Sequence, residues 1–202
     1  MKIDLHVHTI YSGDSSISIG ELSKWCSIQT KLDGIAITDH DNIDGYNRLK
    51  KIRGNEGNLL IIPGIEISFT QGHIIILNVI EEPKRPLLTV ENILDYAKDQ
   101  NGLIIIPHPY RFSGLREKAE DFPADAIEIL NPTASNRENQ MAKLLAQSRK
   151  LPSVAGSDAH NFEHIGKAFN YINCDYSIED VIKAIKFGKS KPNSTYNKQL
   201  KF

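Results

Sequence analysis

Histidines gather at the ends of the apolar runs in this sequence. Six of the seven histidines fall at or beside the end of a predicted strand: His6, His8, His40, His73, His108 and His160. A histidine used only for packing has no reason to prefer such positions. Because the neutral imidazole is the commonest metal ligand in proteins, we expect these side chains to converge on metal ions.

The spacing of two pairs supports this expectation. His6 and His8 are two residues apart, and so are Asp158 and His160 near the last predicted strand. Residues two apart on a strand face the same side, so each pair can bind one ion. In a closed barrel the first and last strands are neighbours, and both pairs would then meet at the carboxyl mouth of the barrel.

Three carboxylates extend the set of candidate ligands. Glu66 lies between apolar residues, where a lone carboxylate is costly unless a cation compensates it. Asp14 follows His8 on a predicted loop, and Asp158 completes nine candidates. One catalytic zinc needs about three protein ligands, so nine suit two or three ions. A set of imidazoles and carboxylates without thiolate suits zinc, manganese or iron and does not distinguish them.

Such a cluster predicts hydrolysis of phosphate esters. Two metals ~3.5–4 Å apart generate a metal-bound hydroxide and stabilise both oxygens of an in-line displacement. The sequence has no nucleophile elbow, P-loop or dinucleotide fingerprint. Arg111, on the loop of His108, is expected to bind phosphate oxygens, with Lys167 as a weaker candidate. We assign catalytic roles to Arg111, Asp158 and Glu66, whereas His164 is expected to lie outside the cluster.

The predicted elements alternate between strands and helices. We expect strands over 2–7, 34–38, 59–62, 74–79, 103–106, 126–130 and 152–155, and helices over 18–30, 89–100, 135–150 and 177–187. Alternating βα units favour a parallel sheet with helices outside, either open and doubly wound or closed as an irregular barrel. The short segment between Glu66 and His73 predicts a hairpin.

Composition sets the class of protein. The chain has 202 residues and a net charge of −1, which predicts one domain without bulk attraction for nucleic acid. The sequence has only two cysteines, Cys26 and Cys174, which excludes a disulfide framework and fits a reducing compartment. No apolar run approaches the ~20 residues of a membrane span, and no signal peptide is recognised, so we expect a cytoplasmic protein. Residues 1–188 are expected to form the domain and 189–202, with four lysines and no acid, a solvated tail.

The motifs taken together resemble the PHP (polymerase and histidinol phosphatase) family. They are DLHVHTxYSxDS from position 4, AITDHD at 36–41, PGIEIS at 63–68, IPHPYR at 106–111 and AGSDAH at 155–160. The resemblance implies an α/β fold, a distorted (βα)7 TIM-like barrel of one domain, with two or three divalent ions (Zn, Mn or Fe) at its mouth. One ion would take His6, His8, Glu66 and Asp158; a second would share Glu66 and take His73 and His108; a third would take Asp14, His40 and His160.

Members of that family act on histidinol phosphate, nucleotides, and DNA or RNA ends. This chain is similar to small, open members, which implies a phosphatase or exonuclease acting on small phosphorylated molecules, nucleotides or oligonucleotide ends. No membrane and no obligate protein partner are expected.

Two other interpretations stay open. Amidohydrolase-type barrels share the His-x-His pair and a late Asp, although their two-metal forms usually have a bridging Lys and eight strands. A non-catalytic module that holds metal for a partner is the third interpretation. The natural substrate, the metal in the cell and the oligomeric state are not determined by the sequence.

Overall fold

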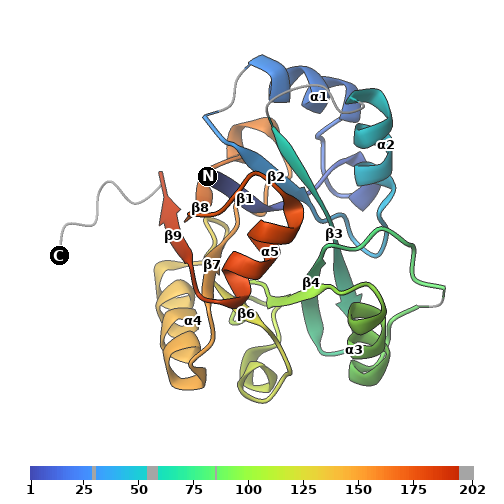
Figure 1. Cartoon of the computed structure of the whole chain (residues 1–202). Helices are drawn as coiled ribbons and strands as arrows, with labels where there is room; N and C mark the ends of the chain where they lie inside the picture. Colours follow the sequence, from blue (N-terminus) through green and yellow to red (C-terminus); the bar gives the residue numbers. More distant parts are fainter. Residues whose placement is uncertain (29–30, 54–58, 85, 196–202) are drawn as a thin grey trace.

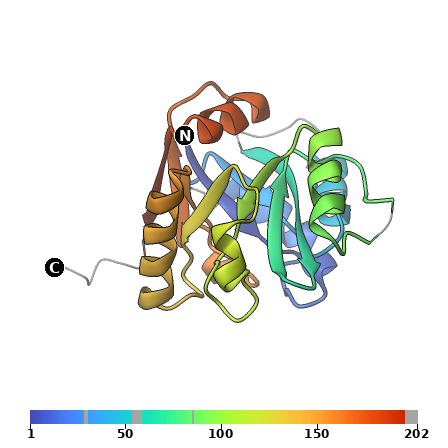
Figure 2. The same ribbon diagram turned by 90° about the horizontal axis from the view of Figure 1, so that it is seen from below.

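The strands form a single curled sheet with helices around it (Figures 1 and 2). A computed structural model describes residues 1–28, 31–53, 59–84 and 86–195. Among these residues the sheet has nine strands, in the order β7-β6-β5-β4-β3-β2-β1-β8-β9. The sheet is nearly closed into a barrel, as the sequence predicts. The strands are β1 Lys2–Val7, β2 Gly34–Ile37, β3 Leu60–Phe69, β4 Gly72–Leu77, β5 Leu103–Ile106, β6 Ala126–Leu130, β7 Ser153–Ala155, β8 Ala168–Ile172 and β9 Ser190–Ser194.

Five α-helices in the described residues follow the predicted order, with one that the sequence reasoning did not assign. They are α1 Ile19–Ile28, α2 Asp44–Arg53, α3 Val90–Asp99, α4 Asn136–Arg149 and α5 Ile178–Lys186; short 3₁₀ turns are η1 Ile10–Ser12, η2 Arg116–Glu120 and η3 Phe162–His164. The unassigned helix is α2. None of the helices among the described residues has the length and apolarity that a membrane crossing requires.

Strand β4 runs against its neighbours, which corrects the expectation of a parallel sheet. It pairs antiparallel with both β3 and β5, whereas β1, β2 and β3 are mutually parallel, as are β5, β6 and β7. The predicted hairpin explains this, because a short turn can join only antiparallel strands. As a result the amino end of β4 lies at the same mouth as the carboxyl ends of its neighbours, and it brings His73 there.

Apolar packing closes the opposite end of the barrel. One buried cluster joins residues of β1 to β7 with Val181, Ile182 and Ile185 of α5. Figures 1 and 2 agree that α5 lies across this end of the sheet. Its helix begins after Ser177, whose side chain accepts a hydrogen bond from the backbone of Asp180. Polar side chains can therefore gather only at the other mouth.

The seam between β1 and β7 is closed by a few specific contacts. The backbone N–H of His8 donates to the carbonyl of Ala159 at 3.0 Å. Farther along, the buried amide of Asn170 accepts from the N–H of Ala155 and donates to the carbonyls of Ala155 and Ile3. Position 156 requires glycine, because a Cβ there would collide with the side chains of His6 and Glu128. The first and last predicted strands are therefore neighbours, as expected.

Strands β8 and β9 are additions that the sequence does not predict. They pair antiparallel with each other, and β8 also pairs antiparallel with β1. β9 is polar and half exposed, so its residues lack the apolar alternation by which strands are recognised. The expectation of a solvated tail from residue 189 is thus wrong for 190–194, while 196–202 lie outside the described residues.

Candidate metal centre

Glu66 lies at the centre of the predicted cluster. Its side chain is 1% exposed, and its two carboxylate oxygens face different imidazoles. Oε2 lies 3.2 Å from Nε2 of His6 and 3.0 Å from Nε2 of His8. Oε1 lies 3.0 Å from Nδ1 of His73 and 3.2 Å from Nε2 of His108. One carboxylate therefore joins two pairs of potential ligands.

Asp158 completes the more buried of these pairs. Its Oδ1 lies 3.5 Å from Nε2 of His6 and 3.4 Å from Nε2 of His8. The backbone of Asp158 has φ 52° and that of His108 has φ 26°, both in the left-handed region that side chains rarely adopt. Strained residues of this kind cluster at functional sites, where the surrounding structure enforces them.

The remaining candidates lie nearer to solvent. Oδ2 of Asp14 is 3.1 Å from Nε2 of His160 and 3.7 Å from Nε2 of His40, and the Asp14 side chain is 53% exposed. The ring of His8 stacks on that of His160, with centroids 4.3 Å apart. We call His6, His8, Glu66, His108 and Asp158 the inner cluster, and Asp14, His40, His73 and His160 the rim cluster.

All nine predicted ligands are brought together at this mouth. Their donor atoms form four overlapping groups: His8, Asp14, His40 and His160; His6, His8 and Asp158; His6, Glu66 and His108; and His40, Glu66 and His73. The grouping differs from the expected one in three ways. His108 and His73 fall into separate groups that both contain Glu66, the group of His6, His8 and Asp158 lacks Glu66, and His8 joins Asp14, His40 and His160. That the nine bind metal stays a prediction.

Polar contacts behind the rings fix which nitrogen faces the cluster. Nδ1 of His6 lies 3.1 Å from Oε1 of Glu128 and donates to it. Nδ1 of His8 donates to the hydroxyl of Ser12 at 2.7 Å, and Ser12 in turn donates to Asp39 at 3.0 Å. With their Nδ1 protons so used, neutral rings present the lone pair of Nε2 to the cluster.

Glu128 is a site residue that the sequence reasoning missed. It is buried on β6 with isoleucines on either side, the same signal that singled out Glu66. Its other oxygen, Oε2, accepts from the backbone N–H of His108 at 2.8 Å. Glu128 therefore orients two residues of the inner cluster at once.

The inner cluster attracts positive charge. Burial alone would lower the pKa of His6, but the carboxylates of Asp158, Glu66 and Glu128 outweigh it and hold that pKa well above its ordinary value. Burial would also lower the pKa of His8, but hydrogen bonds to Asp158 and Glu66 outweigh this effect and raise that pKa to about 9. Burial would likewise raise the pKa of Glu66, yet His6 and the neighbouring rings keep it well below its usual range.

These observations fit divalent cations. Nε2 of His6 and Nε2 of His8 lie 3.0 Å apart, and both face carboxylate oxygens. When both Nδ1 atoms carry their protons, the two Nε2 lone pairs and the carboxylates repel one another unless protons or a metal cation lie between them. Nδ1 of His108 is also buried without a partner among the described residues. Imidazole and carboxylate ligands suit zinc, manganese and iron.

Arg111 contacts the inner cluster directly. Its Nη1 donates to Oδ2 of Asp158 at 2.7 Å, rather than pairing with the surface acids Glu117 or Asp121. The backbone carbonyl of Lys167 accepts hydrogen bonds from the backbone N–H of Thr195 and the hydroxyl of Ser194, while a role of its side chain in phosphate binding stays a prediction. His164 lies in η3 with Nδ1 near the side-chain amide of Asn161, outside the groups as expected.

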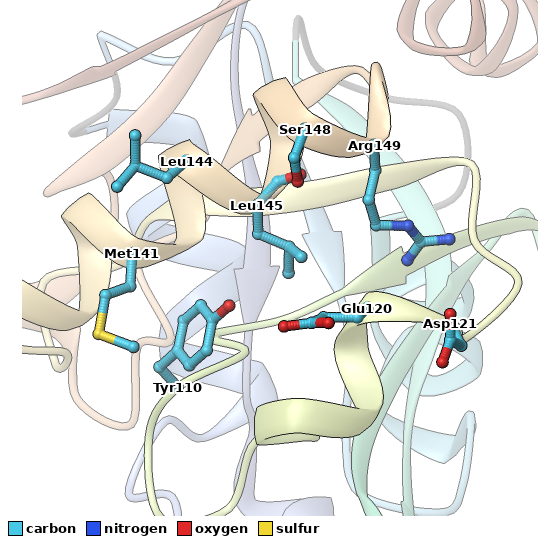
Figure 3. Close-up of a pocket in the computed structure, with 8 residues that line it drawn as sticks. All are labelled: Tyr110, Glu120, Asp121, Met141, Leu144, Leu145, Ser148 and Arg149. Carbon is cyan, nitrogen blue, oxygen red and sulfur yellow. The ribbon is translucent and has the colours of Figure 1, made fainter.

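A separate hollow of about 500 Å³ lies on the outside of the barrel between α4 and η2 (Figure 3). It contains none of the nine candidate ligands, although Tyr110 at its edge shares a loop with His108. Arg149 extends across it and donates to the carbonyls of Ala119 and Phe122. This guanidinium therefore ties α4 to η2, a structural role.

Comparisons with known proteins agree with this geometry. Residues 4–103 match the PHP domain model, and residues 136–190 match the model of the PHP-associated family. An uncharacterised protein of Methanocaldococcus jannaschii is 36% identical over 143 residues, which cover 65% of this chain and 82% of that protein. A second uncharacterised protein of the same organism is 31% identical over 179 residues, 84% of this chain and 69% of that protein.

The fold has a close counterpart among solved structures. A two-domain protein from Bacteroides vulgatus, described as containing a predicted PHP-like metal-dependent phosphoesterase, superposes with a TM-score of 0.80 at 16% identity. The match covers 96% of this chain and 64% of that one, so the chain spans less than two thirds of that protein. At this identity the likeness shows the fold alone. The motifs, the two matching models and the relatives in Methanocaldococcus together carry the assignment: this chain belongs to the PHP family.

Proposed function

We propose that this protein is a metal-dependent phosphoesterase. The observation that carries the proposal is the placement of buried Glu66, whose two carboxylate oxygens face two different pairs of imidazoles. A bridging carboxylate of this kind is what a site for neighbouring divalent ions requires, and such sites catalyse in-line displacement at phosphorus.

The chain offers ligands for two or three ions. In the arrangement that the family motifs imply, His6, His8, Glu66 and Asp158 would hold the first, Glu66, His73 and His108 the second, and Asp14, His40 and His160 the third. The donor atoms support this through four overlapping groups that share His6, His8, His40 and Glu66. When bound, such ions activate water as a nucleophile and neutralise charge on phosphoryl oxygens. Zinc, manganese and iron all suit these ligands.

The protein's own contribution is orientation and charge. Glu128 and the Ser12–Asp39 pair fix the rings of His6 and His8. Arg111 is anchored through one nitrogen to Asp158 and is 32% exposed, so its remaining N–H groups are available to a phosphoryl group. A guanidinium binds two phosphoryl oxygens at once and favours the charge that shifts onto them.

The substrates proposed are phosphate esters of small metabolites, nucleotides or the ends of oligonucleotides. The first test is hydrolysis of p-nitrophenyl phosphate and bis-p-nitrophenyl phosphate by the purified protein with added Mn²⁺. A screen of phosphorylated metabolites and short oligonucleotides then ranks natural substrates.

Metal removal is the decisive control. Chelation is expected to abolish hydrolysis and Mn²⁺, Zn²⁺ or Fe²⁺ to restore it, with metal content followed by elemental analysis. Full activity in protein shown to be free of metal would refute the proposal. Cleavage of amides with no cleavage of phosphoesters would favour an amidohydrolase, and tight metal binding with neither activity would favour a non-catalytic module.

A further inference from the structure

Asp158 uses its two oxygens for different purposes. Oδ1 faces the inner cluster, whereas Oδ2 is surrounded by donors. The donors are Nη1 of Arg111 at 2.7 Å, the hydroxyl of Thr133 at 2.9 Å and the amide of Asn131 at 3.4 Å. Asp158 and Asn131 are buried, whereas Thr133 is exposed and Arg111 is partly exposed, so the donors approach Oδ2 from both the core and the solvent side.

The hydroxyl of Thr133 has one proton and two acceptors. It lies 2.7 Å from Oδ1 of Asn131 and 2.9 Å from Oδ2 of Asp158. Oδ1 of Asn131 already accepts from the backbone N–H of Thr133 at 2.8 Å. The contact to Asn131 is the shorter one, but a hydrogen bond to an ionised carboxylate is stronger than one to a neutral amide oxygen, so charge favours donation to Asp158.

The orientation of the Asn131 amide is equally determined. The side chain is fully buried, and its Nδ2 donates to Oε2 of Glu128 at 2.9 Å as well as facing Asp158. A flipped amide would place its carbonyl oxygen against two carboxylates and its NH₂ against the N–H of Thr133. The nitrogen must therefore point at the acids.

These two donors are held from helix α4 and not from Arg111. The backbone N–H of Asn131 donates to Oδ1 of Asn139 at 3.0 Å, and Nδ2 of Asn139 donates back to the carbonyl of Asn131 at 2.9 Å. Ser135 and Glu138 form a capping box that fixes the start of the same helix. The loop that carries Asn131 and Thr133 is thus anchored at both ends of its short span.

We propose that Asn131 and Thr133 are positioning residues that keep Asp158 oriented toward the inner cluster when Arg111 leaves it to bind a phosphoryl group. The proposal rests on the proposed function of Arg111. Without these donors, Arg111 would have to hold Asp158 and the substrate at the same time. With them, the guanidinium can exchange partners while the buried carboxylate keeps its orientation and its hydrogen bonds.

A double-mutant cycle on metal affinity tests this idea. The variants are Arg111→Ala, Thr133→Val, Asn131→Ala and the double variants that combine each of the last two with Arg111→Ala. The matched control is Thr195→Val, which removes an exposed hydroxyl that donates to the backbone carbonyl of Lys167. Zn²⁺ affinity is measured by competition with a chromophoric chelator, and thermal unfolding confirms that each variant folds. Thr133→Val keeps the side-chain shape, so it remains informative even if Asn131→Ala fails to fold.

Each single variant is expected to weaken the tightest Zn²⁺ affinity by less than about threefold, because the other donors still hold Asp158. Each double variant is expected to weaken it by about 10–100-fold, the usual cost of losing the groups that orient a ligand. Effects that simply multiply, or loss of Zn²⁺ from Arg111→Ala alone, would overturn the proposal.

A second measurement separates this inference from the proposed function. Calorimetry with inorganic phosphate on the Zn²⁺-loaded proteins is expected to show affinity reduced about tenfold or more in Arg111→Ala and unchanged in Thr195→Val. Absence of any phosphoesterase activity in the metal-loaded parent would remove the proposed function, whereas the Zn²⁺ cycle would still decide the role of Asn131 and Thr133.

Discussion

The inner and rim clusters share one mouth but differ in how the protein holds them. Inner side chains are almost wholly buried and have partners behind them, as His6 has Glu128. Rim side chains are more exposed, and Asp14 reaches 53%. Buried charges interact in a low effective dielectric, whereas exposed ones are solvated and screened. From this difference we expect the burial of the ligands, and not their chemical type alone, to set metal affinity, which predicts two classes of metal site at one mouth.

The largest effect is expected at Glu66, the residue of the inner cluster that also contacts His40 and His73 of the rim cluster. Glu66→Gln removes the charge that joins them, which should cost several kcal/mol, or about 10³-fold in turnover, together with loss of bound metal. Turnover and elemental analysis measure both quantities, and exposed Glu163→Gln is the matched control. A variant that keeps nearly parental turnover and metal content would show that Glu66 does not bridge.

Substitution of Arg111 tests whether the substrate's phosphoryl group binds between the inner cluster and solvent. Arg111→Ala should reduce kcat/KM by roughly 10²–10³, as removal of one preorganised donor does. Arg111→Lys should recover only part, because an ammonium lacks the bidentate fork. Metal content should stay near parental in both variants. Unchanged kcat/KM on every phosphoester would move phosphate binding to Lys167 or to backbone N–H groups.

Glu128 tests whether the partners that orient the inner cluster contribute to its metal affinity, because it contacts His6 and His108 on the side away from the cluster. Glu128→Gln keeps the shape but removes the charge that orients His6, so metal affinity should fall by about 10–100-fold. Asp39→Asn, which acts on His8 through Ser12, should have an effect of similar size. Chelator competition measures both. Equal affinity in parent and variants would mean that these acids serve only the fold.

The smallest effect is expected at the rim. Asp14→Asn should weaken one ion by about tenfold or less, since an exposed carboxylate contributes little over water. A weak chelator should therefore remove one ion from the parent before the others, and excess Mn²⁺ should restore the variant. Elemental analysis along the titration would show one class of site, and not two, if burial does not control affinity.

The convergence of the nine side chains on one mouth was predictable because its signal is local. Residues at strand ends, His-x-His spacing and a carboxylate among apolar residues are all visible in the sequence. Glu128 carried the same signal as Glu66 and could have been found by applying that rule to every predicted strand.

Other features depend on distant parts of the chain. The direction of β4 follows from its hairpin, but its pairing with β5 does not. The partly exposed edge strand β9 is stabilised by its ladder with β8 rather than by an apolar face. The roles of Asn131 and Asn170 arise from contacts with residues that no short motif connects to them.

The contacts of Asn170 with β7 affect where the barrel can open locally. β7 ends the strand order on that side, and a side-chain amide occupies places that a neighbouring strand's backbone would otherwise fill. One rotamer change frees the N–H of Ala155, whereas an ordinary ladder must break several bonds together. Local opening is cheapest where few bonds must part, so amide hydrogen exchange should begin along β7 while β2 and β3 remain protected. The barrel thus has a built-in line of weakness that runs toward Asp158, where the chain after β7 meets β1.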